Sequence, residues 1–213
     1  MTSGPQLPSP TRLVVARHGE TEWSKTGRHT GRTDVPLTDV GRDEARRLGE
    51  LLRGRPFSHV VSSPLRRAVE TARLAGFGDR VELDDDLREW DYGIFEGRTR
   101  AEIAETIPGW TVWTQPMTGG ESLDELAARA DRVIARLLPV GGDVLLFSHG
   151  HFLRVLAARW IESEPVTASR LELWTATVSE LGWETDRRVV ELWNTGAAVT
   201  KSALPTAGGP AGG

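Results

Sequence analysis

Two histidines in this chain follow apolar runs and stand next to groups that bind phosphate. Arg17 and His18 come directly after the apolar residues 13–16, and His149 follows a second such run. A neutral imidazole is a nucleophile, and an arginine guanidinium matches the geometry of a phosphate with paired hydrogen bonds. These residue types predict attack by His18 on a phosphate ester, with Arg17 and Arg67 binding the phosphate oxygens.

The protonation state of His18 decides whether it can attack, because only a neutral ring nitrogen carries a lone pair. Nearby guanidinium groups disfavour a second positive charge and keep the imidazole neutral. A backbone carbonyl can accept a hydrogen bond from the other ring nitrogen, and Gly19 would let the chain turn tightly beneath the phosphate. His149, if protonated, would stabilise charge on the transferring phosphoryl group.

The departing alkoxide needs a proton, so a carboxylic acid is expected at the same site. Glu89 is the best candidate, because desolvation by the flanking Trp90 and Tyr92 would keep it protonated as a general acid. It would then serve as the base for the water that cleaves the phosphoenzyme. The residues alone do not rank it confidently above three other carboxyl groups, Glu20, Asp91 and Glu96.

The chain alternates short apolar runs with amphipathic segments up to residue 160. Strands are expected at 13–16, 58–62 and 143–147, and helices at 39–53, 64–74 and 152–160. This alternation predicts a three-layer α/β/α sandwich with a mostly parallel central sheet. Ligands of such sheets bind beyond the carboxyl ends of the strands, so the histidines and arginines should converge on one rim.

Capping residues indicate where several helices begin. Thr38 can cap the helix at 39–53, and Pro64 fits the first turn of the helix after the second strand. Capping boxes are formed by Thr99 with Glu102 and by Ser122 with Glu125. The apolar face of the first helix is expected to contain Ala45, Leu48, Leu51 and Leu52. Residues 84–96 are expected to form a loop, and further strands are expected at 171–174, 178–183 and 189–193.

Length and composition limit the class of protein. The 213 residues favour a single domain, expected at 12–195, with flexible tails at 1–11 and 196–213. The absence of cysteine excludes disulfides, cysteine nucleophiles and thiolate metal sites. No apolar leader or run of about 18 apolar residues is present, so we expect a cytoplasmic protein without membrane contact. The net charge of −4 argues against nucleic-acid binding, and apolar C-terminal strands could mediate a homodimer.

An ordered set of motifs resembles the histidine phosphatase superfamily, which includes the cofactor-dependent phosphoglycerate mutases. The motifs are RHGET at 17–21, TG at 30–31, DVPLT at 34–38, SSPLRRA at 62–68, EWDYG at 89–93 and SHG at 148–150. The resemblance implies a phosphohistidine at His18, phosphate ligands Arg17, Arg67 and His149, Glu89 as proton donor, and no metal or other cofactor. Further phosphate or substrate contacts are expected from Ser24, Thr30, Gly31, Tyr92 and Gly150.

Two departures from the family pattern bear on the reaction. Ser24 stands where the family often has asparagine, which predicts weaker or rearranged phosphate binding. The mutases carry a longer segment with basic residues for a substrate carboxylate, whereas residues 109–116 are short and aromatic here. This difference favours hydrolysis of small sugar or glycerate phosphates over mutase activity. The chain looks similar to an actinobacterial acid-phosphatase branch, and the sugar-bisphosphatase branch has similar loops.

Several other interpretations stay open on sequence alone. His18 could be a buried structural histidine, His149 and His151 could be half of a metal site, and the protein could bind phosphate without turnover. His151 could otherwise line a wall or begin a helix, and His29 could touch substrate or solvent. One or two of four loop tryptophans could select the organic part of the ester: Trp23, Trp90, Trp110 and Trp113.

Overall fold

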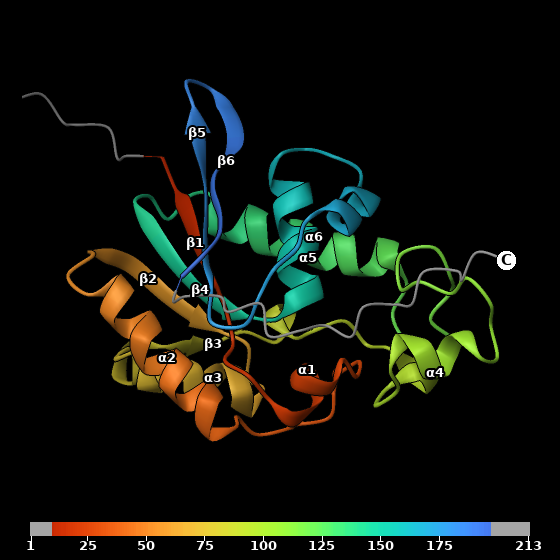
Figure 1. Cartoon of the computed structure of the whole chain (residues 1–213). Helices are drawn as coiled ribbons and strands as arrows, with labels where there is room; N and C mark the ends of the chain where they lie inside the picture. Colours follow the sequence, from red (N-terminus) through yellow and green to blue (C-terminus); the bar gives the residue numbers. More distant parts are fainter. Residues whose placement is uncertain (1–9, 197–213) are drawn as a thin grey trace, which may run out of the picture.

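A computed structural model describes residues 10–196 of the chain, and Figure 1 shows the arrangement of its elements. The tails expected at 1–11 and 196–213 lie mostly outside the described residues. At the N-terminal side, the expected boundary needs one correction. Thr11 is buried, and its hydroxyl donates to the Leu138 carbonyl at 2.8 Å. The side chain also accepts a bond from the backbone N–H of Gly141 at 2.8 Å, so Thr11 packs with the domain and not with the expected tail.

The centre of the fold is a mixed sheet with the strand order β3-β2-β4-β1-β5-β6. The strands are β1 Arg12–Arg17, β2 Phe57–Ser62, β3 Glu82–Leu83, β4 Asp143–Ser148, β5 Val178–Glu184 and β6 Arg187–Thr195. The strands from β3 to β1 pair in parallel, while β5 and β6 pair antiparallel, which confirms the mostly parallel sheet. The register places Arg17 opposite Ser148, so His18 and His149 leave the same edge of the sheet side by side.

Helices cover both faces of the sheet. They are α1 Glu22–Thr26, α2 Asp39–Leu52, α3 Arg66–Leu74, α4 Arg100–Ala104, α5 Leu123–Leu137 and α6 Gly150–Trp160. In Figure 1, α2 and α3 lie on one side of the sheet, and α5 and α6 lie on the other. Alternate residues of β1 enter separate cores: Val14 packs with Leu48 of α2, whereas Val15 packs in the cluster that contains Phe152 of α6.

The capping residues predicted from sequence are confirmed. The Thr38 side chain accepts a bond from the Gly41 backbone N–H at the start of α2. Thr99 with Glu102 and Ser122 with Glu125 each form both bonds of a capping box. These bonds satisfy N–H groups that have no partner within the helix. No helix among the described residues is long and apolar enough to cross a membrane.

Four local predictions differ from the structure. Leu51 is 52% exposed, because it lies about 100° around the helix axis from the buried Leu52. Pro64 precedes α3 instead of entering its first turn, since Leu65 is the N-cap residue. Residues 171–174 form no strand; backbone groups of residues 172–174 bond to side chains instead, and the Leu171 N–H donates to the Ala168 carbonyl. The predicted loop at 84–96 contains two short 3₁₀ turns, Asp85–Leu87 and Gly93–Phe95.

Candidate active site

His18 follows β1 directly and has the tautomer that a nucleophile needs. Its Nδ1 lies 2.8 Å from the Gly19 carbonyl, which can only accept, so Nδ1 carries the hydrogen and Nε2 keeps its lone pair. Burial lowers the pKa of His18 well below its ordinary value, and the charges of Arg67 and Arg17 lower it further. The imidazole is therefore neutral and ready to attack at neutral pH.

Gly19 is needed for close packing and not for a special turn. A Cβ atom there would lie 2.3 Å from the Gly41 carbonyl oxygen at the start of α2, and its φ is not in the left-handed region. Its N–H donates to the Thr71 hydroxyl of α3 at 3.1 Å. Gly19 therefore makes no tight turn of the expected kind. Its contacts with Gly41 and Thr71 bring β1, α2 and α3 together next to His18.

Arg17 is the guanidinium best placed to bind a phosphate. It donates to the Leu173 carbonyl, while its Nε has no partner in the described part of the chain. A Cβ on Gly150 would lie 3.3 Å from Nε of Arg17, so glycine at the start of α6 leaves room for the guanidinium. No carboxylate among residues 10–196 forms an ion pair with Arg17, and its charge is available to an anion.

Arg67 and His149 lie behind His18 and are fully buried. Arg67 donates to the carbonyls of Thr30, Gly31 and Thr33, and its Nε donates to Nδ1 of His149 at 3.1 Å. Arg67 therefore holds the loop at residues 30–33 and the His149 ring in place, and its positive charge acts on His18.

His149 is neutral, in contrast to the protonated form considered from sequence. Its Nδ1 accepts the bond from Arg67, and its Nε2 lies 2.7 Å from the Ser63 hydroxyl. Burial, followed by the charge of Arg67, lowers its pKa well below the ordinary value. The His149 ring stands 5.1 Å from that of His18 between centroids, so it supports the nucleophile as a neutral neighbour.

Glu89 is fixed at the N-terminus of α6. Its Oε1 accepts the backbone N–H groups of Trp90 and Phe152 at 2.9 Å each, and Oε2 accepts that of His151 at 3.0 Å. The carboxyl group is buried, with 8% exposure, and lies in the cavity wall with His18.

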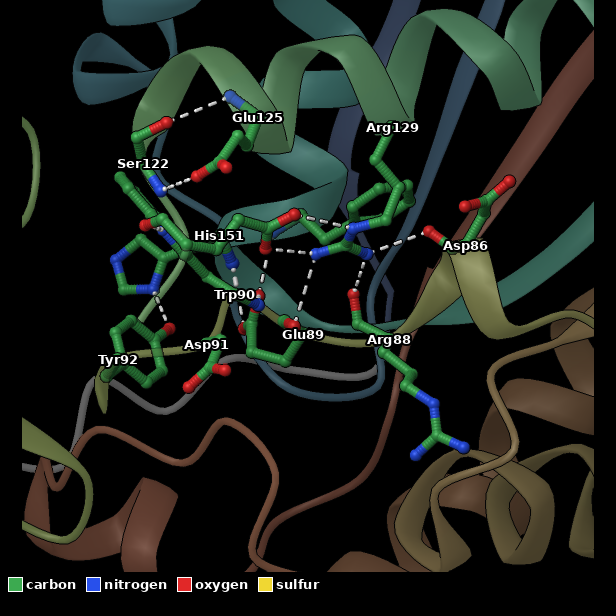
Figure 2. A network of polar contacts seen from close by, with 12 residues as sticks. Asp86, Arg88, Glu89, Trp90, Asp91, Tyr92, Ser122, Glu125, Arg129 and His151 are labelled. Carbon is green, nitrogen blue, oxygen red and sulfur yellow. Dashed lines mark hydrogen bonds and ion pairs between the residues drawn. The ribbon is translucent and has the colours of Figure 1, made fainter. Parts of the chain in front are cut away.

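Arg129 fixes the backbone that carries Glu89, as Figure 2 shows. Its guanidinium reaches from α5 and donates to the carbonyls of Asp86, Arg88 and Glu89. It also forms a two-bond ion pair with Glu121, at 2.9 Å and 2.7 Å. Sequence analysis missed this residue, since an arginine within an amphipathic helix resembles any solvated side chain.

A cavity of about 170 Å³ opens in front of His18. Seven of the predicted site residues line it: Arg17, His18, Ser24, Thr30, Glu89, Tyr92 and Gly150. Arg67, His149 and Gly31 do not line it. The structure thus brings together the candidate nucleophile His18, the guanidinium of Arg17 and the candidate acid Glu89, whereas Arg67 and His149 lie behind them.

The small polar residues of the predicted site have structural partners. The Ser24 hydroxyl donates to the Thr21 carbonyl and accepts the Thr21 N–H, as part of the cap of α1. The Thr30 hydroxyl donates to the Arg28 carbonyl at 3.1 Å. Gly31 contributes its carbonyl to Arg67, and its N–H donates to the Glu96 carboxylate. Ser24 and Thr30 line the cavity, but their hydroxyl groups donate to protein carbonyls. The carbonyls of Thr30 and Gly31 hold Arg67 in place.

Aromatic and imidazole rings form part of the cavity wall. His29, Tyr92 and His151 line it, and the Tyr92 hydroxyl lies 2.6 Å from Nδ1 of His151. None of the four loop tryptophans lines the cavity: Trp110 and Trp113 pack behind His29 and His151, with ring centroids 5.1 Å apart in each pair. The prediction that loop tryptophans contact the organic part of the ester is therefore wrong for this cavity. Tyr92, His29 and His151 line it, and tryptophans pack behind the two histidines.

The geometry does not support the metal-site alternative at residues 149–151. His149 bonds to Ser63 and Arg67, whereas His151 bonds to Tyr92 on the other side of Glu89. Among the described residues, histidine, aspartate and glutamate side chains form no group of three that could hold a metal ion.

A larger cavity of about 810 Å³ shares Glu89 but does not include His18. Its charged side chains are mostly matched, as in the ion pairs of Arg32 with Asp91 and Arg129 with Glu121. Paired charges offer less to an anion than the free guanidinium of Arg17. The smaller cavity is therefore the candidate active site.

Comparisons with known proteins agree with this geometry. The model of the histidine phosphatase superfamily (branch 1) matches residues 13–196. An acid phosphatase of Mycobacterium tuberculosis is 44% identical over 81% of this chain and 87% of its own, and a sedoheptulose 1,7-bisphosphatase of Saccharomyces cerevisiae is 36% identical over 72% and 69%. A solved Mycobacterium tuberculosis open-reading-frame product has a TM-score of 0.82, with 40% identity over 87% of this chain and 98% of its own. The chain belongs to the histidine phosphatase superfamily.

Proposed function

We propose that this protein hydrolyses small phosphate monoesters through a phosphohistidine at His18, without a metal ion. The observation that carries the proposal is the lone pair on Nε2 of a neutral His18, which lines a cavity together with Arg17, whose guanidinium forms no ion pair among residues 10–196. A phosphate drawn to Arg17 places its phosphorus near a nitrogen lone pair.

The reaction takes two steps. First, the Nε2 lone pair of His18 attacks phosphorus, the bond to the ester oxygen breaks, and that oxygen leaves with the electron pair and takes a proton from Glu89. Second, water attacks the phosphohistidine while the Glu89 carboxylate removes one water proton. The N–P bond then breaks, its electron pair returns to Nε2, and inorganic phosphate leaves with the site restored.

The substrates named for the relatives support small phosphate esters as the substrate class. One relative is named as an acid phosphatase and another as a bisphosphatase of a sugar. The cavity of about 170 Å³ has room for a compact ester only. Residues 109–116 contain no basic side chain that could bind a substrate carboxylate, which favours hydrolysis over a mutase reaction.

The experiment is hydrolysis of p-nitrophenyl phosphate by the wild type and His18→Ala, from about pH 4 to about pH 8, with EDTA and vanadate. We expect EDTA-resistant, vanadate-sensitive release of phosphate that disappears in His18→Ala. Full activity of His18→Ala would contradict the proposal, and activity abolished by EDTA would point to a metal-dependent route. With 3-phosphoglycerate, isomerisation faster than phosphate release would show a mutase instead.

A further inference from the structure

Left-handed backbone occurs at two positions that are not exposed turns. Four residues other than glycine have a positive φ among residues 10–196, and two of them, Glu162 and Thr185, are exposed in turns. Ala176 is instead 4% exposed, and Asn194 lies within the strand β6, with φ values of 49° and 58°. Such a backbone costs free energy that the surrounding contacts must offset, and it is frequent at functional sites.

Asn194 lies in a bulge of β6. Between the paired positions Leu192 and Thr195, residues 193–194 stand opposite a single residue of β5, Ser179. The Ser179 hydroxyl accepts the backbone N–H of Asn194 at 2.9 Å and holds the bulge in place. A bulge changes the direction of the side chains that it carries, and asparagine tolerates the left-handed region better than most residues.

The side chains of the bulge hold the chain on both sides of Leu173. Oδ1 of Asn194 accepts the backbone N–H of Trp174 at 2.8 Å. The indole N–H of Trp193 donates to the Glu172 carbonyl at 2.6 Å. Two hydrogen bonds from β6 therefore fix the peptide groups that flank Leu173.

Leu173 in turn holds Arg17. Its carbonyl accepts a bond from Nη1 of Arg17 and is the one protein acceptor of this guanidinium among residues 10–196, where Nε has no partner. Nearby, the Ala176 N–H lies 3.1 Å from the carbonyls of both Arg17 and His18. A guanidinium held by a single bond takes its direction from the carbonyl that accepts it, so the position of Leu173 sets that of Arg17.

We propose that Asn194 and Trp193 are positioning residues for Arg17, the group that binds phosphate, and that they act through the carbonyl of Leu173. This inference rests on the proposed function and names residues that orient its anion-binding group. Neither Asn194 nor Trp193 lines the cavity, whereas Leu173 does. The β6 bulge thus connects the edge strand of the sheet to the phosphate-binding end of the cavity.

The test is the affinity for inorganic phosphate, measured by titration calorimetry. Asn194→Gly removes the side-chain acceptor and leaves a backbone that glycine adopts readily. We expect it to weaken phosphate binding about tenfold, or by about 1.4 kcal/mol, which is slightly less than one charged hydrogen bond contributes. The KM for p-nitrophenyl phosphate should rise similarly while kcat changes less, because Arg17 contacts the phosphate in the bound ester as well as during the reaction.

Three further variants assign the effect. Asn194→Asp keeps an oxygen acceptor and should bind phosphate within about threefold of the wild type. Trp193→Phe removes only the indole N–H and should weaken phosphate binding by about threefold. Thr185→Gly is the matched control, because Thr185 also has a positive φ and lies in the turn between β5 and β6, but it is exposed and does not line the cavity. It should leave the affinity unchanged.

A double-mutant cycle with Arg17→Lys tests whether Asn194 acts through Arg17. The lysine keeps a positive charge, so phosphate binding stays measurable, but its flexible ammonium does not take its direction from one carbonyl. In this background, Asn194→Gly should weaken phosphate binding by less than about twofold. A tenfold loss there would overturn the proposal, because Asn194 would then act on phosphate independently of Arg17.

The possible results separate this inference from the proposed function. Phosphate binding by Asn194→Gly within about twofold of the Thr185→Gly control would overturn the positioning role, and so would an equal loss in Asn194→Asp. If Asn194→Gly fails to fold, unchanged binding by Trp193→Phe would overturn it. A wild type that binds phosphate but hydrolyses no ester would contradict the proposed function alone, and a wild type that does not bind phosphate would overturn both.

Discussion

The two ends of the cavity are built in different ways. At the phosphate end, Arg17 ends the central strand β1 and His18 follows it, while the buried Arg67 and His149 lie behind them and are hydrogen-bonded to each other. At the leaving-group end, His29 and Tyr92 come from loops and Arg154 comes from α6, and the buried Nε2 of His29 has no hydrogen-bond partner among residues 10–196. The comparison shows that the groups behind His18 are fixed by hydrogen bonds within the protein, whereas two cavity-lining residues, Arg17 and His29, each have a buried nitrogen with no such partner in the described chain.

We expect the largest effect from removing the His18 side chain at the phosphate end. His18→Ala should lower kcat/KM by about 10³-fold or more for every ester, because the nucleophile is lost. Steady-state release of phosphate measures this. His59→Ala is a suitable control, since His59 pairs with Glu82 outside the cavity. Equal losses in the two variants would mean that His18 has no special role.

Glu89→Gln should have the next largest effect, and one that depends on the ester. We expect a loss of about 10²–10⁴-fold for an alkyl phosphate, because its alkoxide needs a proton as it leaves. The loss should be smaller for p-nitrophenyl phosphate, whose leaving group is a much weaker base. Glu105→Gln, at an exposed position, controls for the charge change. An equal loss on both esters would argue against proton donation by Glu89.

Arg129→Met should have a smaller effect, of about tenfold on kcat for alkyl phosphates, because the backbone that carries Glu89 loses three donors. Its signature is the same ester dependence as Glu89→Gln, without a matching rise in KM. Arg132→Met, on the same helix, removes only a surface ion pair with Asp86 and is the control. If Arg129→Met reduces the activity equally on both esters, its role is in stability alone.

The last prediction concerns the stability of the fold at His29 and not the reaction rate. The folded-state pKa of His29 is lowered to about 4, whereas the unfolded chain binds its proton near pH 6.5. Protons therefore favour the unfolded state, and stability falls as pH falls from about 6.5 towards about 4, by up to about 1.4 kcal/mol per pH unit for this group.

Urea unfolding of wild type and His29→Gln at several pH values measures this contribution. The variant should lose less stability across the same window, because it lacks the buried group that must stay neutral. His59→Gln, at a part-exposed position, is the control and should keep the wild-type slope. Identical slopes for wild type and His29→Gln would show that His29 is protonated without cost in the folded protein.

The phosphate end could be predicted from sequence because its residues adjoin strand ends. His18 follows an apolar run, and the parallel pairing of β1 with β4 brings His149 beside it. The leaving-group end could not be predicted in this way. Arg154 and Arg159 are both arginines of one amphipathic helix, and only the packing of Trp113 and Ala168 distinguishes them.

The errors in the fold prediction have a related physical cause. Residues 171–174 have the composition of a strand, but the Leu173 carbonyl accepts a bond from Arg17, and the Trp174 N–H donates to Asn194. The segment therefore holds Arg17 in the active site instead of pairing with a strand of the sheet. Glycine is typical of turns, which is why the sequence predicts a turn at Gly19, whereas the contact of Gly19 with Gly41 depends on two elements meeting in space.

The most direct test of the account is to trap the phosphoenzyme. Wild-type protein mixed with a phosphate ester labelled in its phosphoryl group, and quenched in alkali within the first turnovers, should carry the label on the peptide that contains His18. The bond should be stable to alkali and labile to acid, as for a phosphoramidate, and His18→Ala should carry none. Label on another residue, or full turnover without any labelled protein, would contradict a phosphohistidine at His18.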